Sequence, residues 1–236
     1  MLQSNKFTNN KSKFLVNLFI KILFFYFLGI FTYYIFNVNT SNNKYKMINL
    51  AIFASGSGTN AENIIKYFKN NTEVNISLVM TNNKEAYVIE RARNFNIPYY
   101  IFTKKDFNSC IVLNKLHEFD INFIVLAGFL LLVPENIINN FKNRIINIHP
   151  ALLPKYGGKG MYGMNVHNSV IKNNEKESGI TIHYVNKSYD EGDIIFQAKC
   201  QISPKDSPED LAVKVHELEY LYFPKVIEQT IKKVSL

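Results

Sequence analysis

The sequence has few of the features that mark several common classes of protein. It contains only two cysteines, Cys110 and Cys200, and neither lies in a CxxC pair or at metal-ligand spacing. Two isolated thiols are typical of reduced cysteines in a cytosolic protein rather than of a disulfide framework. No cluster of metal-ligand type, no Ser or Cys nucleophile motif and no internal repeat is recognisable. We therefore expect no metal site and no covalent nucleophile.

Acidic residues are absent from the first 46 residues, which contain six lysines. These lysines supply most of the net charge of +8, so that residues 47–236 carry only +2. A strongly basic chain often binds nucleic acid or a membrane surface, but here the body is nearly neutral. We therefore expect no nucleic-acid partner. The hydrophobic share of 47% is typical of a globular chain with a substantial core.

An almost continuous apolar run, residues 14–38, lies within the lysine-rich extension. It is long enough to span a bilayer. Three interpretations remain open: a membrane anchor, a signal peptide without an obvious cleavage site, or translation from an upstream start, since Met47 directly precedes the first strand of the body. We divide the chain into an N-terminal extension, 1–46, and one domain, 47–236.

The body alternates short apolar runs with helical segments. Seven strands are predicted at 48–54, 74–81, 97–102, 121–129, 144–149, 178–185 and 193–202. Helices are predicted at 61–70, 83–96, 105–120, 134–141, 165–173 and from about Pro208 to Lys233. This alternation predicts an α/β protein with a doubly wound, mostly parallel sheet flanked by helices.

Ligands of such sheets bind beyond the carboxyl ends of the strands, and polar segments follow two of the predicted strands. The segment SGSGTN (55–60) joins the first strand to a helix, so its backbone N–H groups and the helix N-terminus suit a phosphate. It is not a GxGxxG motif. A plain strand–helix turn with Thr59 as the helix cap explains the same residues.

Asn147 and His149 lie two apart at the end of a predicted strand, so their side chains share one face. An asparagine can donate to a developing oxyanion, and a histidine can transfer a proton near neutral pH. For an isolated histidine, a hydrogen bond to a loop carbonyl is the simpler interpretation.

Three further elements admit two interpretations each. Asp190 lies in an acidic turn between strands, where turn geometry alone favours such residues. His183 on the preceding strand is either a site residue or a half-buried core histidine. The loop 149–163 holds two prolines and four glycines, as would a loop that closes over a substrate, although a passive surface loop has the same composition.

Four segments together resemble the phosphoribosylglycinamide formyltransferase family, the folate-dependent enzymes of purine biosynthesis. The segments are INLAIFASGSGTNAENII, VLAGFLLLVP, INIHPALLPKYGG and SGITIHYVNKSYDEGDIIFQAKCQI. The resemblance covers nearly all of the body from about Met47. NIHPALLPKY with a later aspartate marks the wider superfamily, and SGSGTN narrows it to this branch. Residues 1–46 have no counterpart in the family core, which favours an upstream start.

The resemblance implies the formyltransferase fold and transfer of a formyl group from 10-formyltetrahydrofolate to the amino group of glycinamide ribonucleotide. Folate would be a co-substrate, and no tightly bound cofactor or metal would be needed. The partners would be these two small molecules, and a membrane only if residues 14–38 are an anchor. The protein would be cytoplasmic and a monomer or a homodimer.

The resemblance also implies roles for individual residues. Asn147 and His149 would stabilise the oxyanion, while Asp190 would raise the pKa of His149 and organise a water that shuttles the proton. The ribonucleotide would be bound by Gly58, Thr59, Asn60 and Glu219. The folate would be bound by Phe129, Leu130, Leu131, Asn147, His183 and Asp190.

One position departs from the family pattern. Many members carry an arginine that pairs with the folate glutamate tail where this chain has Leu131, which puts the affinity for the tail, but not catalysis, in question. The alternatives are a formyltetrahydrofolate deformylase, a methionyl-tRNA or sugar-nucleotide formyltransferase, and a membrane-anchored binding module without activity.

If the upstream-start interpretation holds, a chain that begins at Met47 will be soluble and as active as the full chain. Expression of both forms and an assay of each at equal concentration check this. Solubility that depends on residues 1–46 would contradict it.

Overall fold

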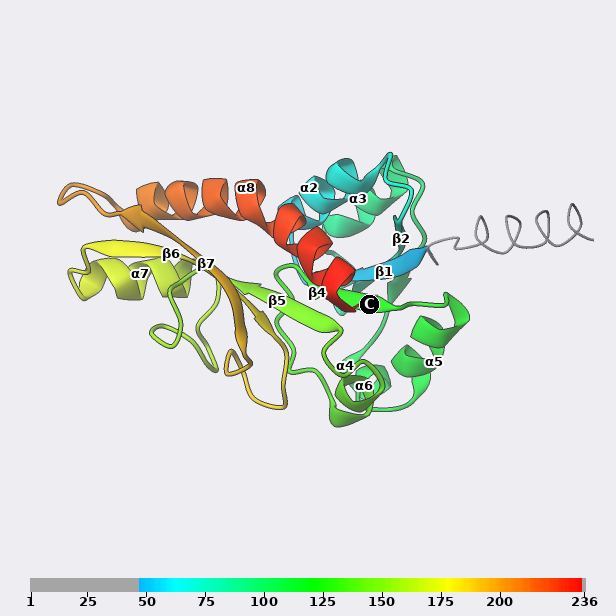
Figure 1. The fold of residues 1–236 in the computed structure, drawn as a ribbon. Coiled ribbons are helices and arrows are strands. Elements are labelled where there is room, and N and C mark those ends of the chain that lie inside the picture. Colours follow the sequence, from blue (N-terminus) through cyan, green and yellow to red (C-terminus); the bar gives the residue numbers. More distant parts are fainter. Residues whose placement is uncertain (1–46, 235–236) are drawn as a thin grey trace, which may run out of the picture. The chain divides into compact units, whose positions relative to one another are not determined.

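The computed structural model describes residues 47–234 as one sheet with helices on both faces (Figure 1). The strands are β1 (Ile48–Phe53), β2 (Val74–Thr81), β3 (Tyr99–Ile101), β4 (Phe123–Leu126), β5 (Ile145–His149), β6 (Glu177–Tyr184) and β7 (Ile194–Gln201). The helices are α2 (Thr59–Phe68), α3 (Val88–Asn94), α4 (Lys104–Phe107), α5 (Ile111–Glu118), α6 (Glu135–Asn140), α7 (Met164–Lys172) and α8 (Pro208–Val234).

The N-terminal extension, 1–46, lies outside the described residues, and so does the apolar run 14–38 with its three interpretations. Among the helices of residues 47–234, none is both long and apolar enough to cross a membrane.

The strand order is β3-β2-β1-β4-β5-β6-β7. Strands β1 to β5 pair in parallel, whereas β6 pairs antiparallel with both β5 and β7. The predicted α/β class with a mostly parallel sheet is therefore confirmed. Because β1 lies between β2 and β4, the chain leaves β1 and β4 in opposite directions along the sheet. A doubly wound sheet opens a crevice at such a point.

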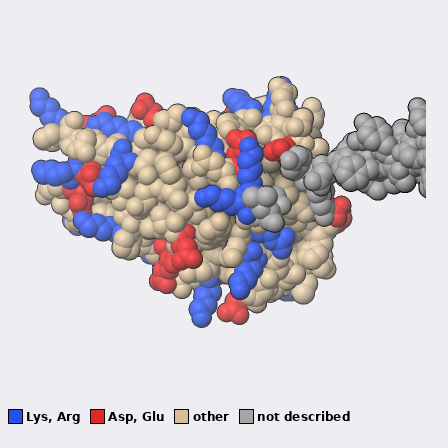
Figure 2. Space-filling model, viewed as in Figure 1, with Lys and Arg blue, Asp and Glu red and all other residues tan. Residues whose placement is uncertain are grey.

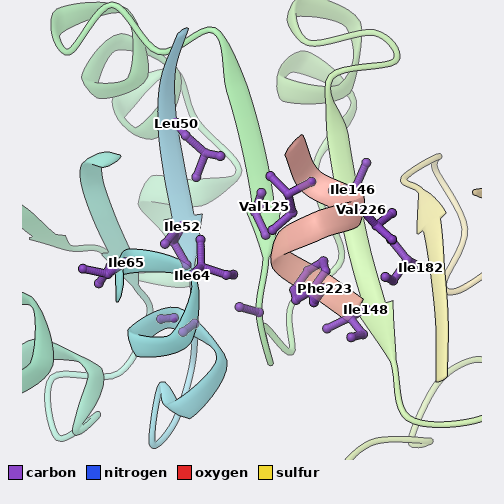
Figure 3. Close-up of a cluster of buried hydrophobic side chains, with 14 of the residues drawn as sticks. Leu50, Ile52, Ile64, Ile65, Val125, Ile146, Ile148, Ile182, Phe223 and Val226 are labelled. Carbon is purple, nitrogen blue, oxygen red and sulfur yellow. The ribbon is translucent and has the colours of Figure 1, made fainter. Parts of the chain in front are cut away.

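Alternate residues of the central strands face two separate cores, as a period of two requires. Leu50 and Ile52 of β1 pack with α2, α3, α7 and α8, while Ala51 and Phe53 pack with α4, α5 and α6. Figure 3 shows the first core, in which Phe223 and Val226 of α8 point toward the strands. Phe223 is fully buried, and a buried side chain of this kind contributes about 1.5–3 kcal/mol to stability.

The helix predicted over 105–120 is in fact two helices, α4 and α5, so this prediction is wrong. Thr103 and Asp106 form a capping box that starts α4. The hydroxyl of Ser109 then donates to the Asp106 carbonyl at 2.8 Å and accepts from the Ile111 amide at 3.2 Å. A serine that bonds the neighbouring backbone in this way competes with the helical hydrogen bonds, and the helix breaks there.

Basic and acidic side chains are mixed on the face of the molecule that Figure 2 shows. Over the described part of this face, lysines and arginines are scattered among acidic residues and do not form a continuous stripe. This distribution matches the low net charge of residues 47–236.

Strands β6 and β7 approach each other very closely at Gly179. A Cβ atom at this position would lie 1.9 Å from the carbonyl oxygen of Ala198. Any side chain would therefore push the two strands apart or force the backbone to shift. Gly56 differs, because its Cβ would meet no atom of the described chain within 4 Å.

We expect Gly179→Ala to lower the free energy of unfolding by about 1–3 kcal/mol, because the added methyl group cannot fit between β6 and β7. Gly56→Ala serves as the matched control and should change it by less than about 0.5 kcal/mol. Denaturant unfolding of both variants measures the difference. Equal midpoints for Gly179→Ala and the wild type would contradict the close approach of the strands.

Candidate active site

A cleft of about 870 Å³ lies beyond the carboxyl ends of β1, β4 and β5. Its walls come from the loops after these strands, the segment 158–163, the turn at Asp190 and the first half of α8. It therefore occupies the crevice that the strand order creates. The cleft brings together all three expected catalytic residues, all four expected ribonucleotide residues, and Phe129 and Leu130 of the expected folate residues.

The glycine-containing loop after β1 has a tightly restricted shape. Gly58 adopts a left-handed conformation with φ 72° and is the N-cap of α2. A Cβ here would lie 2.5 Å from Cγ2 of Val88, so both the backbone and the space require glycine. Thr59 begins the helix instead of capping it, and no side chain of the described residues bonds the cap. Loop N–H groups at a helix N-terminus are thus left available to an anion.

The next residue, Asn60, connects this loop to α8. Its Nδ2 donates to Oε2 of Glu219 at 2.8 Å, and both residues are 9% exposed. Nδ1 of His216 lies 2.7 Å from the same carboxylate oxygen. Oδ1 of Asn60 is buried and has no hydrogen-bond partner among residues 47–234. A buried polar atom in this state is ready to accept a hydrogen bond from a ligand.

Asn147 and His149 lie at the carboxyl end of β5. The antiparallel neighbour β6 orients the side chain of Asn147. Asn147 is directly opposite His183 in the β5–β6 register. Nδ1 of His183 donates to the carbonyl of Tyr184 at 2.8 Å. Since a carbonyl only accepts, Nε2 of His183 is the acceptor for Nδ2 of Asn147, at 3.1 Å. His183 thereby fixes the orientation of the Asn147 amide.

The Asp190 carboxylate lies close to Asn147, His183 and His149. Oδ1 lies 3.4 Å from Nδ2 of Asn147 and 3.6 Å from Nε2 of His183. Oδ2 lies 3.5 Å from Nδ1 of His149 and accepts from the amide of Gly158 at 2.9 Å. Asp190 is therefore within hydrogen-bond or ion-pair reach of both Asn147 and His149.

Both ring nitrogens of His149 face protein groups. Nε2 donates to the carbonyl of Tyr156 at 2.7 Å. The simpler interpretation, a hydrogen bond to a loop carbonyl, is therefore correct, and the same ring also approaches Asp190. Burial is the largest influence on the pKa of His149 and lowers it from 6.5. Asp190 and the Tyr156 carbonyl raise the pKa, but they do not offset the burial.

Asp190 shows the opposite balance. Burial raises the pKa of its carboxyl, but the neighbouring imidazoles of His183 and His149 and the hydrogen bond from the Gly158 amide together outweigh it. The pKa is therefore lowered from its ordinary 3.8, and Asp190 is ionised at neutral pH.

Two expected folate residues do not line the cleft. His183 is buried behind Asn147 and acts on the cleft through that amide. Leu131 packs against the core formed with α4, α5 and α6. Its neighbour Leu130 is 45% exposed and lines the cleft. The ring of Phe129 packs edge-on against Phe53 at 5.3 Å.

Sequence reasoning passed over several residues that line the cleft, among them Tyr162, His167 and His216. His167 is buried, and its Nδ1 has no hydrogen-bond partner within the described part of the chain. His216 precedes Glu219 by one helical turn, a spacing that puts both on one face of a helix and would have been the signal for it. No such pattern marks His167. In residues 47–234, no group of three or more His, Cys, Asp or Glu is placed to hold a metal ion.

Comparison with known proteins places the chain in a family. The family model described as formyl transferase matches residues 48–227. The chloroplastic phosphoribosylglycinamide formyltransferase of Vigna unguiculata is 38% identical over 185 residues, which is 76% of this chain and 59% of that protein. The Arabidopsis thaliana protein of the same name is 37% identical over 78% of this chain and 66% of its own length. The chain thus spans less than two thirds of these plant relatives.

A solved structure agrees in fold over almost its whole length. The crystal structure of phosphoribosylglycinamide formyltransferase from Bacillus halodurans superposes with a TM-score of 0.72 and is 35% identical. The match covers 79% of this chain and 96% of that one. The chain therefore belongs to the formyl transferase family and, within it, to the phosphoribosylglycinamide formyltransferases.

Proposed function

We propose that the chain transfers a formyl group from 10-formyltetrahydrofolate to the amino group of glycinamide ribonucleotide. The observation that carries this proposal is the meeting of Asn147, His149 and Asp190 in one cleft with the glycine loop at Gly58. Such a cleft offers an anion site and oxyanion donors within one cavity. The names of the relatives support the choice of substrate.

The attack forms a bond from the amino nitrogen to the formyl carbon and turns the formyl oxygen into an oxyanion. One hydrogen of the Asn147 amide bonds His183, which leaves the other hydrogen for this oxygen in place of its long 3.4 Å contact with Asp190. A preorganised donor of this kind contributes about 3 kcal/mol to lowering the barrier. His149 adds positive charge when it is protonated.

The intermediate collapses when the bond from the formyl carbon to N10 of the folate breaks. In total one proton passes from the attacking amine to N10. Asp190 is ionised and faces both Asn147 and His149, so it is placed to order a water that carries this proton. It also stabilises the cation of His149 while the oxyanion exists.

The two substrates would approach from opposite sides of this centre. Gly58, Thr59 and Asn60 would hold the phosphate through the loop and the N-terminus of α2, with Glu219 beside them for a hydroxyl group. The folate ring would lie along Phe129 and Leu130.

The scope of the proposal follows from the same residues. Residues 47–236 would carry the activity as one domain, with folate as a co-substrate and no tightly bound cofactor. Action in the cytoplasm as a monomer or homodimer is part of this proposal.

An assay with both substrates tests the function directly. We expect formylated glycinamide ribonucleotide to appear in proportion to the folate consumed. Formate release in the absence of the ribonucleotide would instead support a deformylase and contradict the proposal.

Asn147→Ala should lower kcat by about 10²–10³-fold, because it removes an oxyanion donor. His149→Ala and Asp190→Ala should each lower kcat by about 10²–10⁴-fold through loss of charge stabilisation and proton transfer. Steady-state kinetics of the three variants provide the measurement. The matched control is Glu191→Ala, an exposed carboxylate in the same turn, which should stay near wild type. Near-normal turnover in His149→Ala or Asp190→Ala would mean that the roles are misassigned.

The lowered pKa of His149 makes stability depend on pH. Below pH 6.5 the unfolded chain takes up a proton at this residue, whereas the folded chain does so only at the lower folded pKa. Acid therefore favours the unfolded state across this window, by at most about 1.4 kcal/mol per pH unit. Burial lowers the pKa of His167 as well, which adds a loss of the same sign.

We expect the free energy of unfolding to fall from pH 7 to pH 5, and His149→Asn or His167→Asn to make this fall shallower. Urea unfolding at several pH values measures the slope. Identical slopes in the wild type and both variants would show that the two imidazoles are not held neutral by burial.

A further inference from the structure

The hydrogen bond between His149 and Tyr156 determines which nitrogen of His149 titrates. Nε2 donates to the Tyr156 carbonyl at 2.7 Å. A carbonyl oxygen only accepts, so Nε2 carries a proton in both the neutral and the charged imidazole. The proton that His149 gains or loses is therefore the one on Nδ1, which faces Oδ2 of Asp190 at 3.5 Å. This arrangement puts the exchangeable proton next to the carboxylate.

The Tyr156 carbonyl reaches His149 from a backbone in an unusual conformation. Its φ is 58°, a region that bulky side chains avoid, at a cost of roughly 1–2 kcal/mol. Such a conformation persists when surrounding contacts determine it. The residues that follow Tyr156 also contact the site, because the amide of Gly158 donates to Asp190. The segment 156–158 thus binds both His149 and Asp190.

The contacts that hold Tyr156 lie outside the cleft. Its hydroxyl donates to Oε1 of Glu175 at 2.9 Å and accepts from Nδ2 of Asn173 at 2.9 Å. Nζ of Lys155 lies 3.0 Å from the same Glu175 oxygen. Bonds from Lys155 and Tyr156 lower the pKa of Glu175, so it is an ionised acceptor at neutral pH. None of Lys155, Asn173 and Glu175 lines the cleft.

We propose that Tyr156 and Glu175 are positioning residues that fix the tautomer and ring orientation of His149 through the Tyr156 carbonyl. The hydrogen bond from the Tyr156 hydroxyl to Glu175 fixes the Tyr156 side chain, which stabilises the left-handed backbone of that residue. In this backbone conformation the Tyr156 carbonyl accepts from Nε2 of His149. Neither residue touches the reacting atoms. The inference rests on the proposed function for its effect on turnover, but not for its effect on the tautomer.

Four variants of the full chain separate this role from simple packing. Tyr156→Phe keeps the ring and loses only the hydroxyl. Glu175→Ala removes the acceptor, whereas Glu175→Gln retains a carbonyl oxygen that can accept from the hydroxyl. Glu177→Ala is the matched control, since Glu177 is two residues away and pairs with Lys199 at 2.7 Å instead.

The imidazole nitrogen shifts of His149, assigned by comparison with His149→Asn in ¹⁵N NMR spectra, report the tautomer. We expect the Nε2–H form in the wild type, Glu175→Gln and Glu177→Ala, and a mixture of tautomers in Tyr156→Phe and Glu175→Ala. The last two should also lose about ten-fold in kcat, as a small misplacement of a catalytic group does, with KM for both substrates within about two-fold.

Two outcomes would overturn the inference: an Nδ1–H form in the wild type, or unchanged His149 shifts in folded Tyr156→Phe and Glu175→Ala. If Tyr156→Phe does not fold, Glu175→Ala and Glu175→Gln decide alone. If the shifts change as expected but no formyl transfer is found, the proposed function fails and this inference stands.

Discussion

The Asp190 carboxylate is the point where four groups from β5, β6 and the segment 156–158 meet. It contacts Asn147 of β5, His183 of β6, the His149 ring and the Gly158 amide. Its own backbone adopts φ 58°, a conformation that aspartate tolerates better than most residues. With a side chain only 11% exposed, the carboxylate remains charged because these partners offset its burial. The carboxylate thus links the ends of β5 and β6 to the segment 156–158.

The two ionisable partners respond to the same burial in opposite ways. Burial leaves His149 neutral despite the carboxylate beside it, whereas Asp190 stays ionised because it has more favourable contacts. The cleft therefore contains a buried anion next to an imidazole that is ready to accept a proton. Because both side chains are buried, their interaction is screened less than it would be in water.

Much of the architecture follows from local patterns, whereas the chemistry follows from long-range contacts. Short apolar runs predicted all seven strands, and SGSGTN and Asn147 fall at the carboxyl ends of two of them. The break between α4 and α5 was missed because it depends on one serine hydroxyl.

The meeting of Asp190 with His149 could be expected only from family resemblance, since no spacing links a turn to a strand 41 residues earlier. The direction of the His149 pKa shift depends on how deeply the ring is buried, which no motif encodes. Leu130 and Leu131 are neighbours in the chain, but Leu131 packs against the core whereas Leu130 lines the cleft.

The link between Asn60 and Glu219 joins residues 159 positions apart. During synthesis, the five parallel strands leave the ribosome well before α8, so the sheet can assemble while one wall of its crevice has not yet been made. A nascent chain at that stage has Asn147 and His149 but lacks Glu219 and His216. This wall of the cleft therefore forms in one late step, when the last helix docks on the completed sheet.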